Sequence, residues 1–149
     1  MIDAAKNRVI LIVEDNIDDF EAVESAILNT GNFAGLIKRC ASGQEALDIL
    51  TAAGTGPHSA AAQQPSLIIL DLNLPGLTGL EVLERIKSDG RLQMTPVVVM
   101  TSSTDQRDIN ACYRAGANAY LQKPMELDRL FSSVSRLTAF WLDTAILAV

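Results

Sequence analysis

The stretch LIILDLNLPGLTG, residues 67–79, decides the fold of this 149-residue chain. It begins with four apolar residues, Leu67–Leu70, and turns polar at Asp71. A short apolar run without alternation is typical of a strand buried on both faces. Thr78, followed three residues later by Glu81, forms the capping-box pattern that begins a helix. The stretch therefore predicts a buried strand, a polar turn and a helix.

Similar units lie on both sides of this stretch. Between further apolar runs are segments with the hydrophobic period of an amphipathic helix, and Ser42 with Glu45 forms a second capping box. Strands that alternate with helices require right-handed crossovers, so we predict one α/β domain with a parallel sheet and helices on both faces. The predicted strands are residues 9–13, 35–40, 67–70, 96–100 and 119–121.

The composition of the chain limits the type of domain and the partners that it can bind. With 48% hydrophobic residues the chain can bury a core of one globular domain. Twelve Lys and Arg against 18 Asp and Glu give a net charge of −6, which argues against nucleic acid or an anionic membrane surface as partner. Two cysteines, Cys40 and Cys112, are too few for a disulfide scaffold or a zinc site, so we expect both to be small buried side chains.

The sequence shows no secretory or membrane-spanning segment. The first apolar run is too short for a secretory signal, and the apolar stretch 137–149 is too short to cross a bilayer, so we expect a cytoplasmic protein.

Residues 54–65, GTGPHSAAAQQP, are expected to form a surface insertion at the amino-terminal edge of the sheet. The single histidine, His58, is then a solvated loop residue.

Polar residues follow the predicted strands, where open α/β sheets bind their ligands. They are Glu14 and Asp15, Asp71 with Asn73, Thr101, and Lys123. Three carboxylates in one small crevice raise one another's pKa and repel unless a cation neutralises them. All-oxygen ligation suits Mg²⁺, which usually also takes phosphate oxygens of a substrate. The pattern therefore indicates phosphoryl chemistry.

Four motifs together resemble one family, the receiver domains of two-component response regulators. They are VILIVEDN at 9–16, LIILDLNLPGLTG at 67–79, PVVVMTSS at 96–103 and AYLQKP at 119–124. The resemblance covers nearly the whole chain and implies a doubly wound, five-stranded parallel sheet with strand order 2-1-3-4-5, the flavodoxin-like order. It also implies a signalling protein that accepts a phosphoryl group and loses it slowly, rather than an enzyme.

The resemblance assigns roles to the acidic residues. Asp71 is expected to attack the phosphorus of a phosphohistidine on a sensor histidine kinase and form an acyl phosphate. Asp15 is the expected direct ligand of Mg²⁺, and Glu14 acts largely through water. The backbone carbonyl of Asn73 completes the ligands that the protein supplies.

The same resemblance assigns the remaining site residues. Lys123 and Thr101 are expected to contact the phosphoryl oxygens, over which charge spreads in the transition state. The bond between Lys123 and Pro124 is expected to be cis, as is typical of the family. Tyr120 resembles the aromatic switch residue that enters the space Thr101 leaves, and the affected surface is the fourth helix, the fifth strand and the fifth helix.

The end of the chain predicts self-association. We expect residues 1–149 to be a single receiver without an output domain, with 138–149 as an apolar C-terminal arm. Its Phe140, Trp141 and Leu142 resemble the tail of single-domain response regulators associated with bacterial phytochromes, which dimerise through this region. Aromatic residues are common interface anchors, so we predict a homodimer. Folding of the arm onto its own domain is the alternative.

Two other classes share parts of this pattern. Phosphatases that form an aspartyl phosphate on a similar sheet use a second aspartate two residues after the nucleophile, but this chain has Asn73 there. A flavodoxin-like cofactor binder needs a phosphate-binding loop after the first strand. Glu14 and Asp15 would repel a phosphate at that position. The residues therefore favour a receiver over both alternatives.

Overall fold

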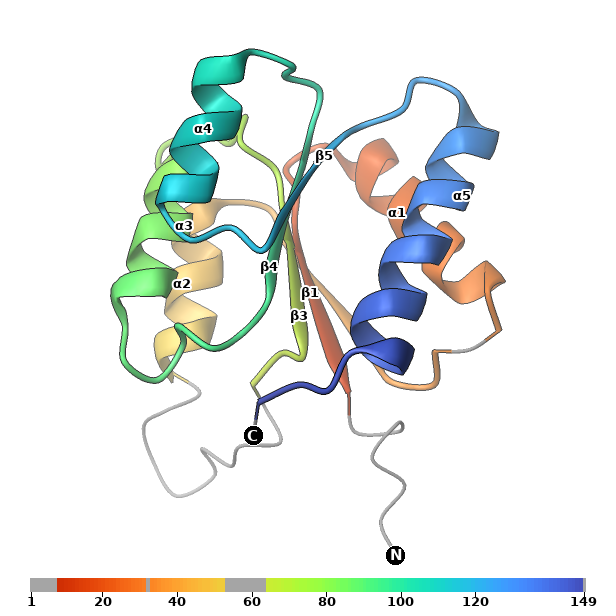
Figure 1. Cartoon of the computed structure of the whole chain (residues 1–149), viewed down its shortest axis with the longest axis horizontal. Coiled ribbons are helices and arrows are strands. Elements are labelled where there is room, and N and C mark those ends of the chain that lie inside the picture. The colour runs from red at the N-terminus through yellow and green to blue at the C-terminus, as the bar shows by residue number, and fades with distance from the viewer. Residues whose placement is uncertain (1–7, 32, 53–63, 149) are drawn as a thin grey trace, which may run out of the picture.

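The computed structural model describes residues 8–31, 33–52 and 64–148. Five parallel strands form one sheet between two layers of helices, with α1 and α5 on one face and α2, α3 and α4 on the other (Figure 1). The strand order is β2-β1-β3-β4-β5, so the expected topology is confirmed. The strands are β1 (Val9–Val13), β2 (Leu36–Cys40), β3 (Leu67–Leu70), β4 (Val97–Thr101) and β5 (Ala119–Gln122). The helices are α1 (Ile17–Asn29), α2 (Gly43–Ala52), α3 (Gly79–Ser88), α4 (Gln106–Arg114) and α5 (Leu127–Thr138).

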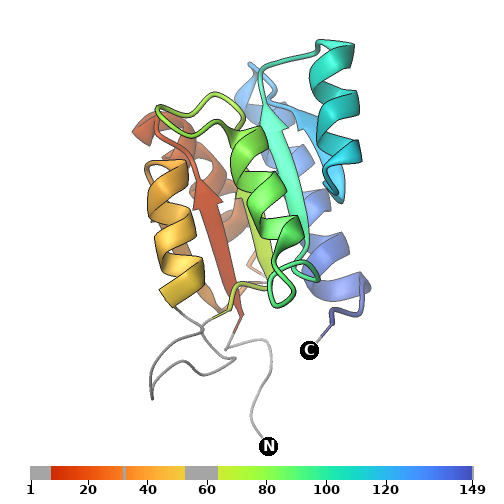
Figure 2. The same ribbon diagram turned by 90° about the vertical axis from the view of Figure 1, so that its left-hand side faces the viewer.

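The core is divided by the sheet into two clusters. Alternate residues of β1 face opposite sides, so Leu11 packs beneath α2 and α3 while Ile10 packs beneath α1 and α5. The central strands β3 and β4 are buried throughout, as the apolar runs predict. Figure 2 looks onto α2 and α3 in front of the strands. Cys40 and Cys112 are buried, and burial raises the pKa of each thiol to about 11, so both remain thiols at neutral pH.

The two capping boxes form to different extents. At α3 the Thr78 hydroxyl accepts from the Glu81 N–H at 3.2 Å, and the Glu81 carboxylate accepts from the Thr78 N–H at 3.4 Å. At α2 the Ser42 hydroxyl accepts from the Glu45 N–H at 3.1 Å. The Glu45 carboxylate instead accepts from the N–H of Ala41 at 2.9 Å. Both helix starts are thus stabilised, the second by a shifted partner.

The C-terminal arm is packed partly on its own domain. After α5 the chain continues as a π-helical segment, Ala139–Thr144. Leu142 is buried in the cluster between the sheet, α1 and α5, Trp141 is half-buried against it, and Phe140 is 52% exposed. The Phe140 and Trp141 rings meet edge to face, with centroids 5.1 Å apart. Leu142 is therefore packed on its own domain, which was the alternative to dimerisation, whereas Phe140 stays on the surface.

Three further expectations concern the insertion at 54–65, the end of β4 and membrane-spanning helices. The insertion at 54–65 and its His58 fall largely outside the described residues, which resume at Gln64. Thr101 is the last residue of β4 rather than the first residue after it. Among the helices of the described ranges, none is long and apolar enough to span a membrane.

Candidate functional site

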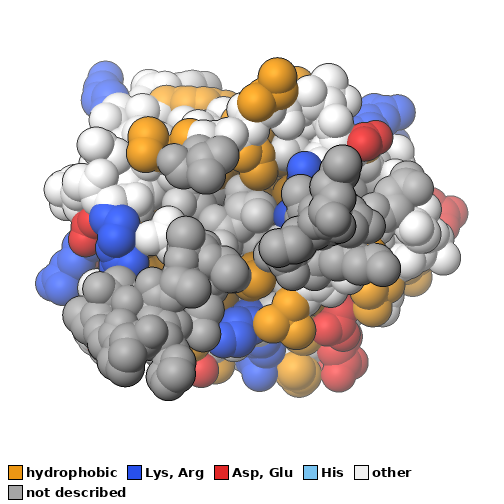
Figure 3. Space-filling model, turned by 90° about the horizontal axis from the view of Figure 1, so that it is seen from below, with side chains coloured by type: hydrophobic (Ala, Val, Ile, Leu, Met, Phe, Trp, Pro, Cys, Tyr) orange, Lys and Arg blue, Asp and Glu red, His pale blue; other side chains and the backbone are white. Residues whose placement is uncertain are grey.

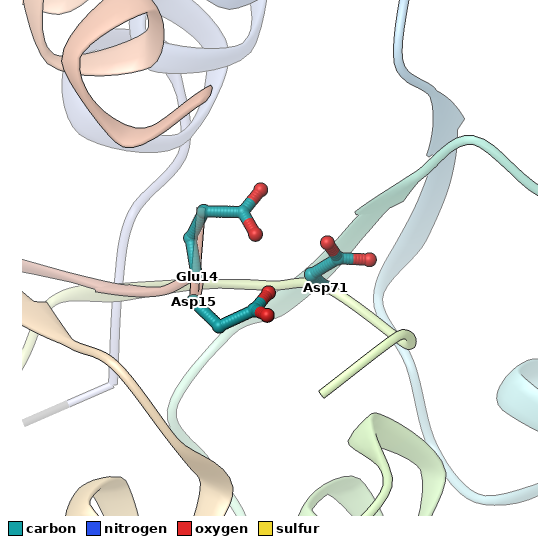
Figure 4. Close-up of side chains that lie close together, drawn as sticks. All are labelled: Glu14, Asp15 and Asp71. Atoms are coloured by element: carbon teal, nitrogen blue, oxygen red, sulfur yellow. The ribbon is translucent and has the colours of Figure 1, made fainter. Parts of the chain in front are cut away.

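The site lies at the end of the sheet where the strands terminate, and three carboxylates converge there. Glu14 and Asp15 follow β1, and Asp71 follows β3. The ladder hydrogen bonds continue into both loops: the Asp71 N–H donates to the Val13 carbonyl at 3.1 Å, and the Glu14 N–H to that of Cys40 at 2.9 Å. One ligand oxygen from each carboxylate lies within 4.8 Å of the others (Figure 4). Glu14 and Asp71 are buried, while Asp15 is exposed.

Lys123 brings the opposite charge to these carboxylates. Its backbone N–H donates to the Thr101 carbonyl at 2.7 Å, which anchors the end of β5 beside β4. Its ammonium contacts Glu14, Asp71 at 2.9 Å and Asp19 at 3.0 Å. The structure therefore unites Glu14, Asp15, Asp71 and Lys123 as predicted. It adds Asp19, in the first turn of α1, which the sequence analysis missed.

The two buried carboxylates differ in their proton affinity. Burial raises the pKa of Glu14 to about 7; the nearby Asp71 charge adds to this, and Lys123 only partly offsets it. Burial acts in the same direction on Asp71, but hydrogen bonds from Lys123 and from the Asn73 N–H outweigh it and lower the Asp71 pKa. The carboxylates around Lys123 raise its pKa above the usual value against the effect of burial. Asp71 is therefore an anion at neutral pH, with a cation beside it.

The loop after β3 is built to hold Asp71. The Asn73 N–H donates to the Asp71 Oδ1 at 3.1 Å. Gly79 begins α3 directly against this loop, and a Cβ there would lie 2.1 Å from the Asp71 carbonyl oxygen. Gly76 has a φ of +73°, a conformation that side chains disfavour. The sequence LNLPGLTG after Asp71 thus folds as a tight turn that fixes the carboxylate.

Thr101 and Tyr120 occupy the β4 and β5 side of the site. Thr101 is fully buried, and its hydroxyl has no hydrogen-bond partner within the described residues. The Tyr120 hydroxyl donates to the carbonyl of Ser103 at 2.9 Å, beyond the end of β4. Burial raises the pKa of Tyr120, so it remains a neutral donor. An unpaired buried donor is costly, which marks the Thr101 hydroxyl as a group that a bound acceptor would stabilise.

The expected cis bond before Pro124 is wrong, because all peptide bonds of the described residues are trans. The Lys123 side chain is aimed by other means, namely the backbone bond to Thr101 and the three carboxylates on its ammonium.

Arg39 is a second residue that the sequence analysis missed. From β2 its guanidinium donates to the backbone carbonyls of Glu14 at 3.2 Å and Asp15 at 2.9 Å. The guanidinium also lies 5.7 Å from the ring centroid of Phe20 in α1. Its only sequence signal is that it is a basic residue within the predicted strand 35–40. Arg39 holds the loop that carries both carboxylates after β1.

Comparison with known proteins agrees with this geometry. The sequence profile of the response regulator receiver domain matches residues 10–135. The chain belongs to this family. As a receiver, it is a signalling protein. It is 38% identical over 140 residues to the response regulator Rcp1 of Synechocystis sp., covering 94% of this chain and 92% of Rcp1.

Two solved structures share the fold of this receiver. The phosphorylated cyanobacterial phytochrome response regulator RcpA superposes with a TM-score of 0.85 at 37% identity, covering 95% of this chain and 99% of that one. The Mn²⁺-bound form of Rcp1 superposes with a TM-score of 0.84, with the same identity and coverage. The receiver is thus related to phytochrome response regulators.

The acidic cluster fits a divalent cation. Its donors are carboxylate oxygens, which hard cations prefer, and they lie close enough together for one ion to reach all three. One of the similar structures binds Mn²⁺. Glu14, Asp15 and Asp71 are therefore the residues that would hold a divalent metal.

Proposed function

We propose that this receiver accepts a phosphoryl group on Asp71 from the phosphohistidine of a sensor histidine kinase, with Mg²⁺ held by Glu14, Asp15, Asp71 and the Asn73 carbonyl. The observation that carries the proposal is the arrangement around Asp71. Its carboxylate is kept ionised by Lys123, lies beside two further carboxylates, and faces the carboxyl end of the sheet. A carboxylate is a competent nucleophile for such a transfer.

The transfer step uses the chain's own residues as follows. An oxygen of Asp71 forms a bond to phosphorus while the bond from phosphorus to the kinase imidazole breaks, and the imidazole leaves with the electron pair. Lys123 moves its ammonium from the carboxylate to the phosphoryl oxygens. The unpaired Thr101 hydroxyl donates to another of these oxygens. Mg²⁺, when bound, supplies charge neutralisation at the transferred group.

Labelled phosphoryl transfer tests this proposal. A phosphorylated histidine kinase should label the full chain in the presence of Mg²⁺, and excess chelator should prevent the labelling. Asp71→Asn should remove it, whereas Asp48→Asn on the exposed side of α2 should not. Label that persists in the Asp71→Asn variant would overturn the assignment of Asp71.

The kinase and the output are further parts of the proposal. The similarity to phytochrome response regulators supports a light-regulated kinase of the phytochrome type as donor. We place the protein in the cytoplasm as a single receiver that signals by protein contact and dephosphorylates slowly. Tyr120 would be the switch residue, released from the Ser103 carbonyl when Thr101 moves. In a panel of phosphorylated kinases, transfer should be fastest from a light-regulated one.

Self-association through the C-terminal arm completes the proposal. Leu142 is buried within its own domain, so Phe140 and Trp141 are the anchors left for a partner copy. They line a surface groove with Ala119 and Leu121 of β5, the edge strand. Burial of aromatic side chains from two copies would favour a closed dimer.

Light scattering at micromolar concentration tests the dimer. The full chain should have dimer mass, and Phe140→Ser should shift it toward monomer. Leu28→Ser is the matched control, since Leu28 is 56% exposed on α1, outside the groove. A wild-type chain that stays monomeric would contradict the proposal.

A further inference from the structure

The Lys123 ammonium lies among three carboxylates, and one of them is outside the acidic cluster. Glu14 and Asp71 belong to the cluster, whereas Asp19 comes from α1. Asp19 Oδ2 lies 3.0 Å from the ammonium, close to the 2.9 Å of Asp71. An ammonium has three hydrogens, so these acceptors use all of them. Asp19 therefore engages one hydrogen that would otherwise be free for the cluster.

Asp19 is held in place independently of the cluster. Its backbone N–H donates to the side chain of Asn16, the N-cap of α1, at 3.0 Å. Its side chain is 47% exposed, against 5% for Glu14 and 7% for Asp71. Asp19 is thus the most exposed of the three acceptors of the ammonium.

This placement matters because a cation and the ammonium need the same oxygens. Lys123 contacts Glu14 and Asp71, which are also two of the three residues that would hold a divalent metal. Like charges repel, so a bound metal would weaken the contacts of the ammonium with these carboxylates. This weakening costs less when an anionic acceptor outside the cluster is already in contact with the ammonium.

We propose that Asp19 is a positioning residue for Lys123, an inference that rests on the proposed function. Its carboxylate draws the ammonium toward α1 and leaves oxygens of Glu14 and Asp71 open to a divalent cation. Without it, the ammonium settles on the cluster and competes more strongly with the metal.

The neighbouring Asp18 provides a matched control. It lies in the same first turn of α1, so Asp18→Asn and Asp19→Asn remove the same charge from nearly the same place along the helix dipole. Asp18 is exposed and is not among the acceptors of Lys123 in the described structure. The difference between the two variants isolates the contact with Lys123.

Calorimetric titration of the purified full chain with Mg²⁺ tests the inference. The dissociation constant for Mg²⁺ should be about threefold higher in Asp19→Asn than in Asp18→Asn. This is the scale expected for the loss of a partly exposed ion pair. In a Lys123→Met background this difference should disappear. Melting curves confirm that each variant is folded, and Asp19→Ser serves as a second variant.

The outcomes separate this inference from the proposed function. A wild-type chain that binds no Mg²⁺ overturns the proposed metal site. A wild-type chain that binds Mg²⁺, with equal dissociation constants for Asp18→Asn and Asp19→Asn, overturns only the role of Asp19. A difference that persists without Lys123 also overturns that role, because Asp19 would then act on the metal directly.

Discussion

Two lysines at opposite ends of the sheet use their ammonium groups in the same number of hydrogen bonds but with different partners. At the carboxyl end, Lys123 donates to three carboxylates. At the amino end, Lys87 donates to the carbonyls of Gln93 at 3.0 Å and Thr95 at 2.9 Å, and to the Asn118 side chain at 3.0 Å. Figure 3 views this second end, where Lys and Arg side chains lie at several separate places.

The partners decide what each lysine can do. Burial lowers the pKa of Lys87, since its acceptors carry no charge. The carboxylates around Lys123 raise its pKa instead. Lys87 is a fixed link between the segment after α3 and the start of β5, whereas Lys123 balances a charge that changes when a metal or phosphoryl group arrives. The role of each ammonium thus follows from the charge of its acceptors, not from the number of its hydrogen bonds.

The two lysines should differ most in phosphoryl transfer. Lys123→Met should slow labelling of the protein by a phosphorylated kinase by roughly 100-fold, the scale of losing one donor to a developing anion. Lys87→Met should leave the rate near that of the wild type, because Lys87 lies at the other end of the sheet. Equal losses in both variants would contradict the separate roles of the two lysines.

A smaller effect is expected on stability at the amino end. Lys87→Met should lower the free energy of unfolding by about 2 kcal/mol, because the Thr95 carbonyl loses its charged donor in a part-buried place. Urea denaturation measures this loss. An unchanged midpoint would show that water replaces the ammonium and that Lys87 is not a structural link.

The sequence predicts the carboxyl end of the sheet well for a simple reason. In a parallel sheet the carboxyl ends of all strands lie at one edge, so the apolar runs alone place Asp15, Asp71 and Lys123 at the same edge of the sheet. The family resemblance then supplied the strand order, which periodicity could not. It also supplied the cis bond at Pro124, which is wrong here.

Residues on helices were harder to predict. An acidic residue in the first turn, such as Asp19, is typical of a solvated partner of the helix dipole, and its contact with Lys123 depends on how α1 lies against the sheet. Lys87 likewise has the pattern of a basic residue in a last turn. Leu142 follows the buried Thr138 by four residues, so it lies on the same helical face and packs into the cluster between the sheet, α1 and α5, whereas Phe140 is exposed.

Two buried threonines show the same contrast between the site and the rest of the fold. The Thr101 hydroxyl has no partner among the described residues, whereas the Thr138 hydroxyl in α5 donates to the Val134 carbonyl at 2.9 Å. Thr101→Val should raise the free energy of unfolding by about 1 kcal/mol, since a buried unpaired polar group is removed. Thr138→Val should leave it unchanged or lower it. Chemical denaturation distinguishes the two, and a loss of stability in Thr101→Val would show that its hydroxyl is already satisfied.

The weakest effect concerns the one cluster carboxylate that Lys123 does not contact. Asp15 is exposed and lies within 4.8 Å of Glu14 and Asp71, so its charge repels theirs. Asp15→Asn should therefore raise the free energy of unfolding of the metal-free protein slightly, by less than about 1 kcal/mol.

The same variant should lose the rise in melting temperature that Mg²⁺ gives the wild type, because the best-exposed ligand is gone. Asp18→Asn removes an equal charge nearby and should keep that rise. If Asp15→Asn instead lowers the melting temperature of the metal-free protein, then the Asp15 carboxylate makes attractive contacts that stabilise the fold. The carboxyl end would then resemble the amino end, where Lys87 links two segments of the chain through its hydrogen bonds.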